Sequence, residues 1–186
     1  LVIADAKRAQ AIAGVMGGMA SEVSGATRTV AFESAYFKPA SVRRASKRLG
    51  LKTAASSRFE RGADMNAAVM ALQRAIALMQ QIEAGRLIGP IIDRYPQPRG
   101  PKLLHLRRAR LALLLGLSVP DAEVEHILRV LGLGVTPTTD GWDLVVPTFR
   151  VDLLREADLI EEVGRHYGFD KLEPTFPVMT STAAPS

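Results

Sequence analysis

Cysteine is absent from this 186-residue sequence, which excludes disulfide bonds, thiolate metal sites and cysteine nucleophiles. Long apolar runs are absent too: a run such as Leu111 to Leu117, which contains a glycine, is far too short for a bilayer-spanning helix, which needs roughly 20 apolar residues. No basic-then-apolar leader opens the chain, so nothing indicates secretion, and we expect a cytoplasmic protein without membrane contact. The first residue is Leu1, inside a predicted strand, so we expect the chain to be a piece of a longer protein.

The overall composition is that of a globular protein, because 47% of the residues are hydrophobic and 23% are charged. The net charge of +5 conceals an asymmetry between the two halves. Residues 1–100 carry 15 Lys/Arg against 7 Asp/Glu, and residues 101–186 carry 9 against 12. This asymmetry predicts two surfaces with different partners, and the basic surface is a candidate for nucleic-acid binding.

A proline-rich segment, Tyr95 to Pro101, divides the chain where the charge balance changes sign. Proline fixes φ and removes a backbone donor, so three prolines in seven residues exclude a helix or a central strand here. The predicted organisation is a first unit at 1–95, a linker at 96–101, a second unit at 102–175 and a tail at 176–186.

The first unit mixes short strands with helices. Alternating or short apolar runs predict strands at 1–4, 9–13, 30–35 and 88–92. One helix is expected from Pro39 to the stop signal Gly50, and a longer one is capped by Asp64 and ended by Gly85. This mixture predicts an α+β fold.

The second unit is predicted to contain a strand at 103–106, helices at 107–115 and 121–131, a hairpin, and a final helix from about Asp158. The hairpin is indicated by Asp140-Gly141, because both residues tolerate the positive φ of a tight turn. Helices followed by a β-hairpin suggest a winged-helix-like arrangement, although a fold does not imply a function.

A basic stretch runs from Lys38 to Arg61, with eight Lys/Arg against one acid, Glu60. Arg44, Lys47 and Arg48 recur at i, i+3 and i+4, so they share one helix face. Such a face is typical of phosphate binding, and we therefore predict contact with RNA or with an acidic partner. The alternative is an ordinary solvated helix face.

Four acids form the counterpart in the second unit, and three of them share one helical stripe. They are Asp152, Asp158, Glu161 and Glu162. Carboxylates without a nearby histidine suit Mg²⁺ better than Zn²⁺. The spacing alone nevertheless favours a structural interpretation, since acids near a helix start complement its dipole and Glu161 can pair with Arg165.

Several longer motifs, taken together, give the chain a specific resemblance. They are AIAGVMGG at 11–18, FESAYF at 32–37, a stretch from Arg44 through RLGLKTAAS at 48–56 to RFERG at 58–62, VPTFRVD at 146–152, DLIEEV at 158–163 and YGFD at 167–170. In this order the chain resembles the β subunit of bacterial phenylalanine–tRNA ligase over nearly its whole length. The resemblance implies a truncated mixed α/β editing module followed by a small winged-helix-like domain.

The family is an α₂β₂ enzyme that charges tRNA(Phe) with phenylalanine using ATP, and its β subunit hydrolyses tRNA misacylated with tyrosine. By motif, the resemblance places Gly17, Glu33 and Ala55 in the editing pocket. It places Asp152, Asp158, Glu161 and Glu162 at a Mg²⁺ site shared with the α subunit, and so favours the metal interpretation. Glu33 is expected on a strand, as a buried carboxylate whose cost a polar ligand offsets.

The resemblance assigns no catalytic residue of aminoacylation to this chain, so the fragment alone is expected not to charge tRNA. Two other functions stay open from the sequence. One is a winged-helix nucleic-acid-binding protein without enzymatic activity, although the helix at 121–131 is acidic and would repel phosphate. The other is a purely structural interaction module.

Overall fold

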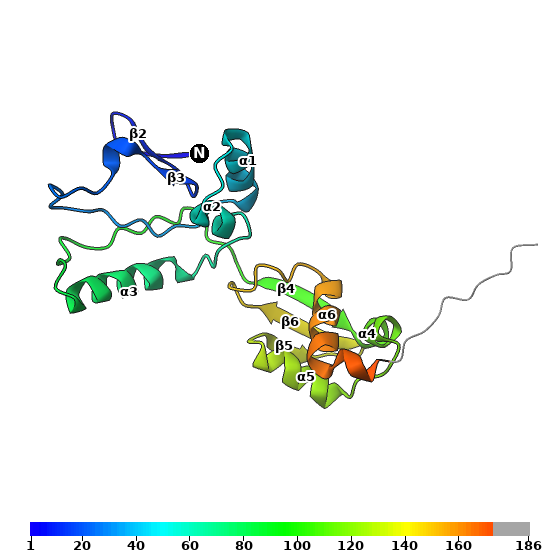
Figure 1. Cartoon of the computed structure of the whole chain (residues 1–186). Coiled ribbons are helices and arrows are strands. Elements are labelled where there is room, and N and C mark those ends of the chain that lie inside the picture. Colours follow the sequence, from blue (N-terminus) through cyan, green and yellow to red (C-terminus); the bar gives the residue numbers. More distant parts are fainter. Residues whose placement is uncertain (173–186) are drawn as a thin grey trace, which may run out of the picture. The chain divides into compact units, whose positions relative to one another are not determined.

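The computed structural model describes residues 1–172, which form two compact units. The first unit comprises Leu1–Gly100 with Thr148–Val151, and the second comprises Pro101–Pro147 with the described residues from Asp152 onward. Figure 1 shows both units along the chain. The predicted tail at 176–186, and residues 173–175 of the predicted second unit, lie outside the described residues.

The first unit begins with a small antiparallel sheet in the order β1-β2-β3. Its strands are β1 (Val2–Ala4), β2 (Ala9–Ile12) and β3 (Met16–Gly17), and a short 3₁₀ helix, η1 (Met19–Ser21), follows. The register pairs Ile12 with Val2 on one side and with Met16 on the other. The two strands predicted near the start of the chain are therefore confirmed.

Helix α1 (Pro39–Leu49) has the bounds that its end signals predict, with Pro39 in its first turn and Gly50 in a left-handed conformation just beyond it. Helix α2 (Ala54–Phe59) follows after a short connection and packs against α1. A small core of Ala13, Val15, Phe37 and Val42 lies beneath them. The Phe59 ring packs edge-on against Phe37, with 5.0 Å between ring centres.

Helix α3 (Ala67–Gln81) is the longer predicted helix, but it ends before the predicted stop at Gly85 and none of its residues is fully buried. Its N-cap residue is Asn66 instead of the predicted Asp64, whose carboxylate accepts the Asn66 N–H at 2.9 Å just before the helix. The strands predicted at 30–35 and 88–92 are wrong, since neither segment pairs with a strand in the described chain. Alternating apolar and polar residues indicate that one side of an extended segment can be buried. A β-strand forms only where a neighbouring strand offers free N–H and C=O groups for hydrogen bonds.

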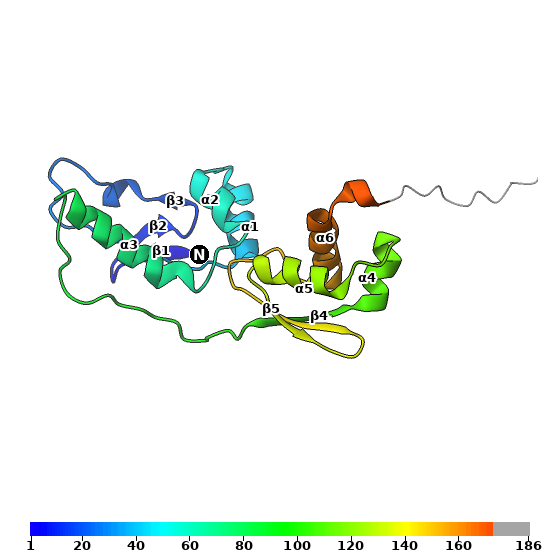
Figure 2. The same cartoon turned by 90° about the horizontal axis from the view of Figure 1, so that it is seen from below.

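The second unit is a three-stranded antiparallel sheet in the order β4-β6-β5, with three α-helices on one side of it (Figure 2). Its elements are β4 (Lys102–Arg107), α4 (Arg108–Leu115), α5 (Asp121–Val130), β5 (Gly134–Pro137), β6 (Gly141–Val146), α6 (Glu156–Tyr167) and the 3₁₀ helix η2 (Phe169–Lys171). The core lies between sheet and helices, around Leu106, Leu128, Trp142 and Leu159. The α+β class is confirmed.

The predicted hairpin exists as β5-β6, but not for the predicted reason. Neither Asp140 nor Gly141 has a positive φ. Gly141 instead opens β6 directly against β4, where an added Cβ would lie 1.9 Å from the Leu106 carbonyl oxygen. Glycine is needed here for close approach of two backbones.

The outer face of this sheet carries a histidine between two carboxylates. His105 Nδ1 lies 2.7 Å from Asp143 Oδ1, and its Nε2 lies 3.3 Å from Asp140 Oδ2. The hydrogen bond with Asp143, reinforced by the charge of Asp140, raises the pKa of His105 above its ordinary value. Protonated His105 therefore stabilises the folded state.

This arrangement predicts a pH-dependent stability. The contribution is fully present below the ordinary histidine pKa and is lost as pH rises through the higher folded-state pKa. In urea unfolding from about pH 5.5 to about pH 8.5, stability should fall with rising pH in the wild type and change less in His105→Gln. The control is His126→Gln, since His126 is exposed on α5 and forms no ion pair in residues 1–172. Equal pH dependence in all three proteins would contradict the prediction.

Candidate functional site

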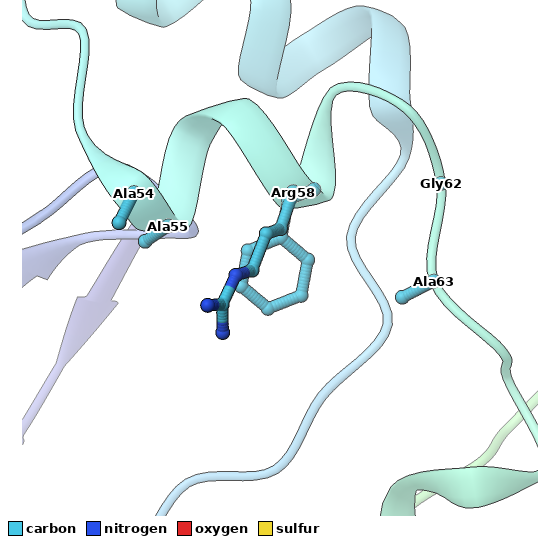
Figure 3. A pocket seen from close by; sticks show the side chains of 6 residues that line it. Ala54, Ala55, Arg58, Gly62 and Ala63 are labelled. Atoms are coloured by element: carbon cyan, nitrogen blue, oxygen red, sulfur yellow. The ribbon is translucent and has the colours of Figure 1, made fainter.

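Two open cavities lie side by side in the first unit, with volumes of about 460 and 420 Å³. Ala54, Ala55 and Phe59 line both, so α2 forms their common wall. The first cavity is completed by Arg58, Gly62 and Ala63, as Figure 3 shows from close by. The second is lined by residues of β1, β2 and β3, the loop at 13–15, Glu33 and Thr53.

The structure brings the three predicted pocket residues, Gly17, Glu33 and Ala55, to the lining of the second cavity. Gly17 ends β3, and an added Cβ there would meet no atom within 4 Å, so packing does not require this glycine. Ala55 lies in the first turn of α2, and its methyl group is exposed. Gly17 on β3 and Ala55 on α2 are both small, so the second cavity stays open beside them.

A network of hydroxyl groups holds α2 against the sheet. Thr53 Oγ1 accepts the Ser56 N–H at 3.0 Å, and the Ser56 hydroxyl accepts the Thr53 N–H in return, which completes a capping box. Thr53 Oγ1 also donates to the Val15 carbonyl at 2.6 Å, so the helix start is bonded to the loop after β2. The cavity wall that carries Ala55 is therefore capped at its start and anchored there to the loop after β2.

Glu33 differs from expectation in two respects. It lies in an extended segment that pairs with no strand in the described chain, and its side chain is exposed instead of buried. Partial burial still raises the pKa of its carboxyl. No ion pair engages Glu33 within residues 1–172, so its oxygens are open to a ligand in the cavity.

The predicted basic face lies on α1. Arg44, Lys47 and Arg48 are all exposed there, and none forms an ion pair or side-chain hydrogen bond in the described part of the chain. Arg43, beside them, donates from Nη2 to the Glu60 carbonyl at 3.0 Å. The helix thus presents a face of free cations.

The predicted acidic quartet is not one cluster. Asp158 Oδ2 accepts the N–H groups of Leu154 at 2.8 Å and Arg155 at 3.0 Å, at the start of α6. Burial acts to raise the pKa of Asp158, but these backbone hydrogen bonds outweigh it and lower the pKa overall. Glu162 is buried, with Oε2 2.6 Å from Arg165 Nη2, whereas Asp152 and Glu161 are exposed.

Residues 1–172 contain no group of three or more His, Cys, Asp or Glu side chains placed to hold a metal ion. Two carboxylates of the quartet already serve α6, one as a cap and one in an ion pair. The quartet therefore does not fit Mg²⁺ as a self-contained site, and further donors would have to come from another chain.

Comparison with known proteins matches each unit to a known domain family. A family model described as the B3/4 domain matches residues 1–84, and one described as the tRNA synthetase B5 domain matches residues 104–169. The chain is 44% identical over 178 residues to the phenylalanine–tRNA ligase beta subunit of Geobacter sulfurreducens, covering 95% of this chain and 22% of that protein. It is 43% identical over 190 residues to that of Methylococcus capsulatus, covering 100% and 24%.

The chain belongs to the phenylalanine–tRNA ligase β-subunit family. The resemblance carried by the sequence motifs is thereby confirmed. The chain spans less than a quarter of the length of these curated relatives. No helix within residues 1–172 is long and apolar enough to cross a membrane.

Three residues around the cavities escaped prediction. Thr53 anchors α2, Phe59 lines both cavities, and Arg58 lines the first. All three lie within or beside motifs that carry the resemblance to the phenylalanine–tRNA ligase β subunit, close in sequence to Ala55. That proximity was the available signal, because one turn of helix carries neighbouring side chains to the same wall.

Proposed function

We propose that the first unit contributes to a hydrolytic site that removes tyrosine from misacylated tRNA in a phenylalanine–tRNA ligase. The observation that supports it is the convergence of Gly17, Glu33 and Ala55 on one open cavity. In this proposal residues 1–95 are the later part of the editing module. Residues 102–175 are the winged-helix-like domain that follows it.

The chemistry of discrimination follows from one hydroxyl group. Tyrosine carries a phenol that phenylalanine lacks, and the Glu33 carboxylate can accept a hydrogen bond from it. Sites built to bond a hydroxyl discriminate by about 10⁴–10⁵, whereas apolar pockets discriminate poorly. Gly17 and Ala55 leave room for the ring. Water attacks the ester, positioned by substrate and backbone groups.

The test of this function is Glu33→Ala in the intact heterotetramer. Deacylation of tyrosyl-tRNA(Phe) should slow by roughly 10- to 100-fold, because the substitution removes a hydrogen bond to a charged acceptor. Phenylalanine charging should stay nearly intact. Glu22→Ala is the control, since Glu22 is exposed beyond η1 and lines neither cavity. A normal deacylation rate in Glu33→Ala would make Glu33 a structural residue.

For the second unit we propose a role in assembly with an α subunit into an α₂β₂ enzyme of the cytoplasm. The whole enzyme would bind ATP, phenylalanine and tRNA(Phe), and this chain alone would not aminoacylate. Asp152, Asp158, Glu161 and Glu162 would lie at the interface, where the α subunit completes the donor set around Mg²⁺. The support is chemical, since only hard oxygen donors are present.

We propose further that Arg44, Lys47 and Arg48 lie near the tRNA. This proposal is supported by the fact that none of the three has an acidic partner in the described chain. The alternative of a winged-helix protein that binds nucleic acid without catalysis has less support. Its recognition helix would be α5, where Asp121 pairs with Arg108 and Glu125 pairs with Arg129, so the helix carries little free positive charge.

A further inference from the structure

Among residues 1–172, Arg58 is the only charged residue that lines the first cavity, whose other walls are Ala54, Ala55, Phe59, Gly62 and Ala63. Figure 3 shows the Arg58 side chain on the same side of α2 as the methyl groups of Ala54 and Ala55. A cation beside small apolar residues at an open cavity is well placed to meet an anionic group of a ligand.

In the described part of the chain, no protein group holds this guanidinium. Arg58 forms no ion pair or side-chain hydrogen bond in residues 1–172, and neither Glu33 nor Glu60 pairs with it. By contrast, Arg43 donates to the Glu60 carbonyl, and Arg107 and Arg129 pair with carboxylates in the second unit. The five donors of Arg58 are therefore free.

The base of the side chain is nevertheless well positioned. Arg58 lies one turn after the capping box of Thr53 and Ser56, and Thr53 is bonded to the Val15 carbonyl. The neighbouring Phe59 ring packs on Phe37. A side chain with free donors on an anchored helix loses less entropy when it binds a ligand than one on a mobile loop.

We propose that Arg58 binds the phosphate of the nucleotide that carries the misplaced amino acid. This inference rests on the proposed hydrolytic function. The amino acid carboxyl is esterified to the ribose and carries no charge, so the nearest anion of the substrate is the phosphodiester on the other side of that ribose. With the tyrosyl ring among Gly17, Glu33 and Ala55, the ribose lies beside Ala54, which lines both cavities, and the phosphate meets the planar guanidinium of Arg58.

The test compares two substrates of the intact heterotetramer, tyrosyl-tRNA(Phe) and tyrosyl-adenosine, the same ester without any phosphate. Arg58→Met should raise KM for tyrosyl-tRNA by roughly 10- to 100-fold, with little change in kcat, and should leave tyrosyl-adenosine hydrolysis unchanged. The slope of log(1/KM) against log salt should become shallower by about 0.7, as for one contact to a single strand. Arg58→Lys should recover part of the lost substrate affinity, because lysine keeps the positive charge but lacks the paired donors of the planar guanidinium.

Arg74→Met, on the exposed face of α3, is the control and should match the wild type on both substrates. Unchanged kinetics of Arg58→Met on tyrosyl-tRNA would overturn the assignment. Equal losses on both substrates would also overturn it, because Arg58 would then act on the ester, the base or the fold.

Failure of the proposed function gives a different result, since the wild type would then hydrolyse neither ester. Binding still decides the role of Arg58 in that case. The trinucleotide CCA should bind the wild type more tightly than Arg58→Met, with adenosine bound equally by both proteins. Equal CCA affinity in the two proteins would overturn the assignment.

Discussion

Replacing Ala55 with tryptophan is expected to lower deacylation of tyrosyl-tRNA(Phe) by roughly 100-fold or more, because even a displacement of about 1 Å of a reacting ester costs on the order of 10²-fold in rate. Ala55 lines both cavities from the first turn of α2. An indole there fills the space between α2 and Gly17 and excludes the substrate ring. Deacylation by the intact heterotetramer is the measurement.

The substitution changes no charge, so it separates the shape of the pocket from the carboxylate of Glu33. Ala77→Trp, on the exposed face of α3, is a matched control that should deacylate normally. Phenylalanine charging should be unaffected in both variants. If Ala55→Trp and Glu33→Ala both deacylate at the wild-type rate, the hydrolytic function proposed for this unit is wrong.

Truncating Leu106 to alanine is expected to destabilise the second unit by about 2–5 kcal/mol, the usual cost of a cavity in a packed core. Leu106 is 0% exposed and packs in the core beside Trp142. Leu103 lies on the same strand, β4, but on the opposite face, and is 70% exposed. Leu103→Ala should change stability by no more than about 0.5 kcal/mol.

Urea unfolding followed by tryptophan fluorescence measures this difference in one unit alone. Trp142 is the single tryptophan of the chain and is fully buried in the second unit. The midpoint of Leu106→Ala should fall well below that of the wild type, while that of Leu103→Ala should stay close to it. Similar midpoints for the two variants would mean that the sheet does not separate a buried from an exposed face.

Local signals account for the elements that the sequence predicted well. Helix α1 begins at Pro39 and stops at Gly50 because each residue acts through its own backbone conformation, independent of distant partners. The strands and helices of the second unit follow the same logic, since their apolar periodicities match the faces that the core buries. Motif resemblance added the family, which the composition and periodicity did not indicate.

The errors occurred where a non-local partner decides the outcome. Residues 30–35 alternate like a strand but find no ladder to join, so Glu33 lies exposed on an extended segment. The Asp140-Gly141 signal predicted the hairpin, yet the need for glycine comes from the approach of β4, distant in sequence. The carboxylates of α6 share a stripe by spacing, but two of them are already engaged. Asp158 accepts the Leu154 backbone N–H at the start of α6, and Glu162 pairs with Arg165.

By itself, the sequence determined the longer helices, where charge of each sign gathers, and the family to which the motifs point, because these depend on neighbouring residues. It did not predict the short helix α2 (Ala54–Phe59). The motif resemblance had already assigned Gly17, Glu33 and Ala55 to one pocket, but only the tertiary structure gives the cavity that they line and the unpaired Arg58 beside it within residues 1–172. The physical reason is that a cavity is a property of packing. Its walls come from segments separated by many residues, held together by contacts such as the hydrogen bond from Thr53 to Val15.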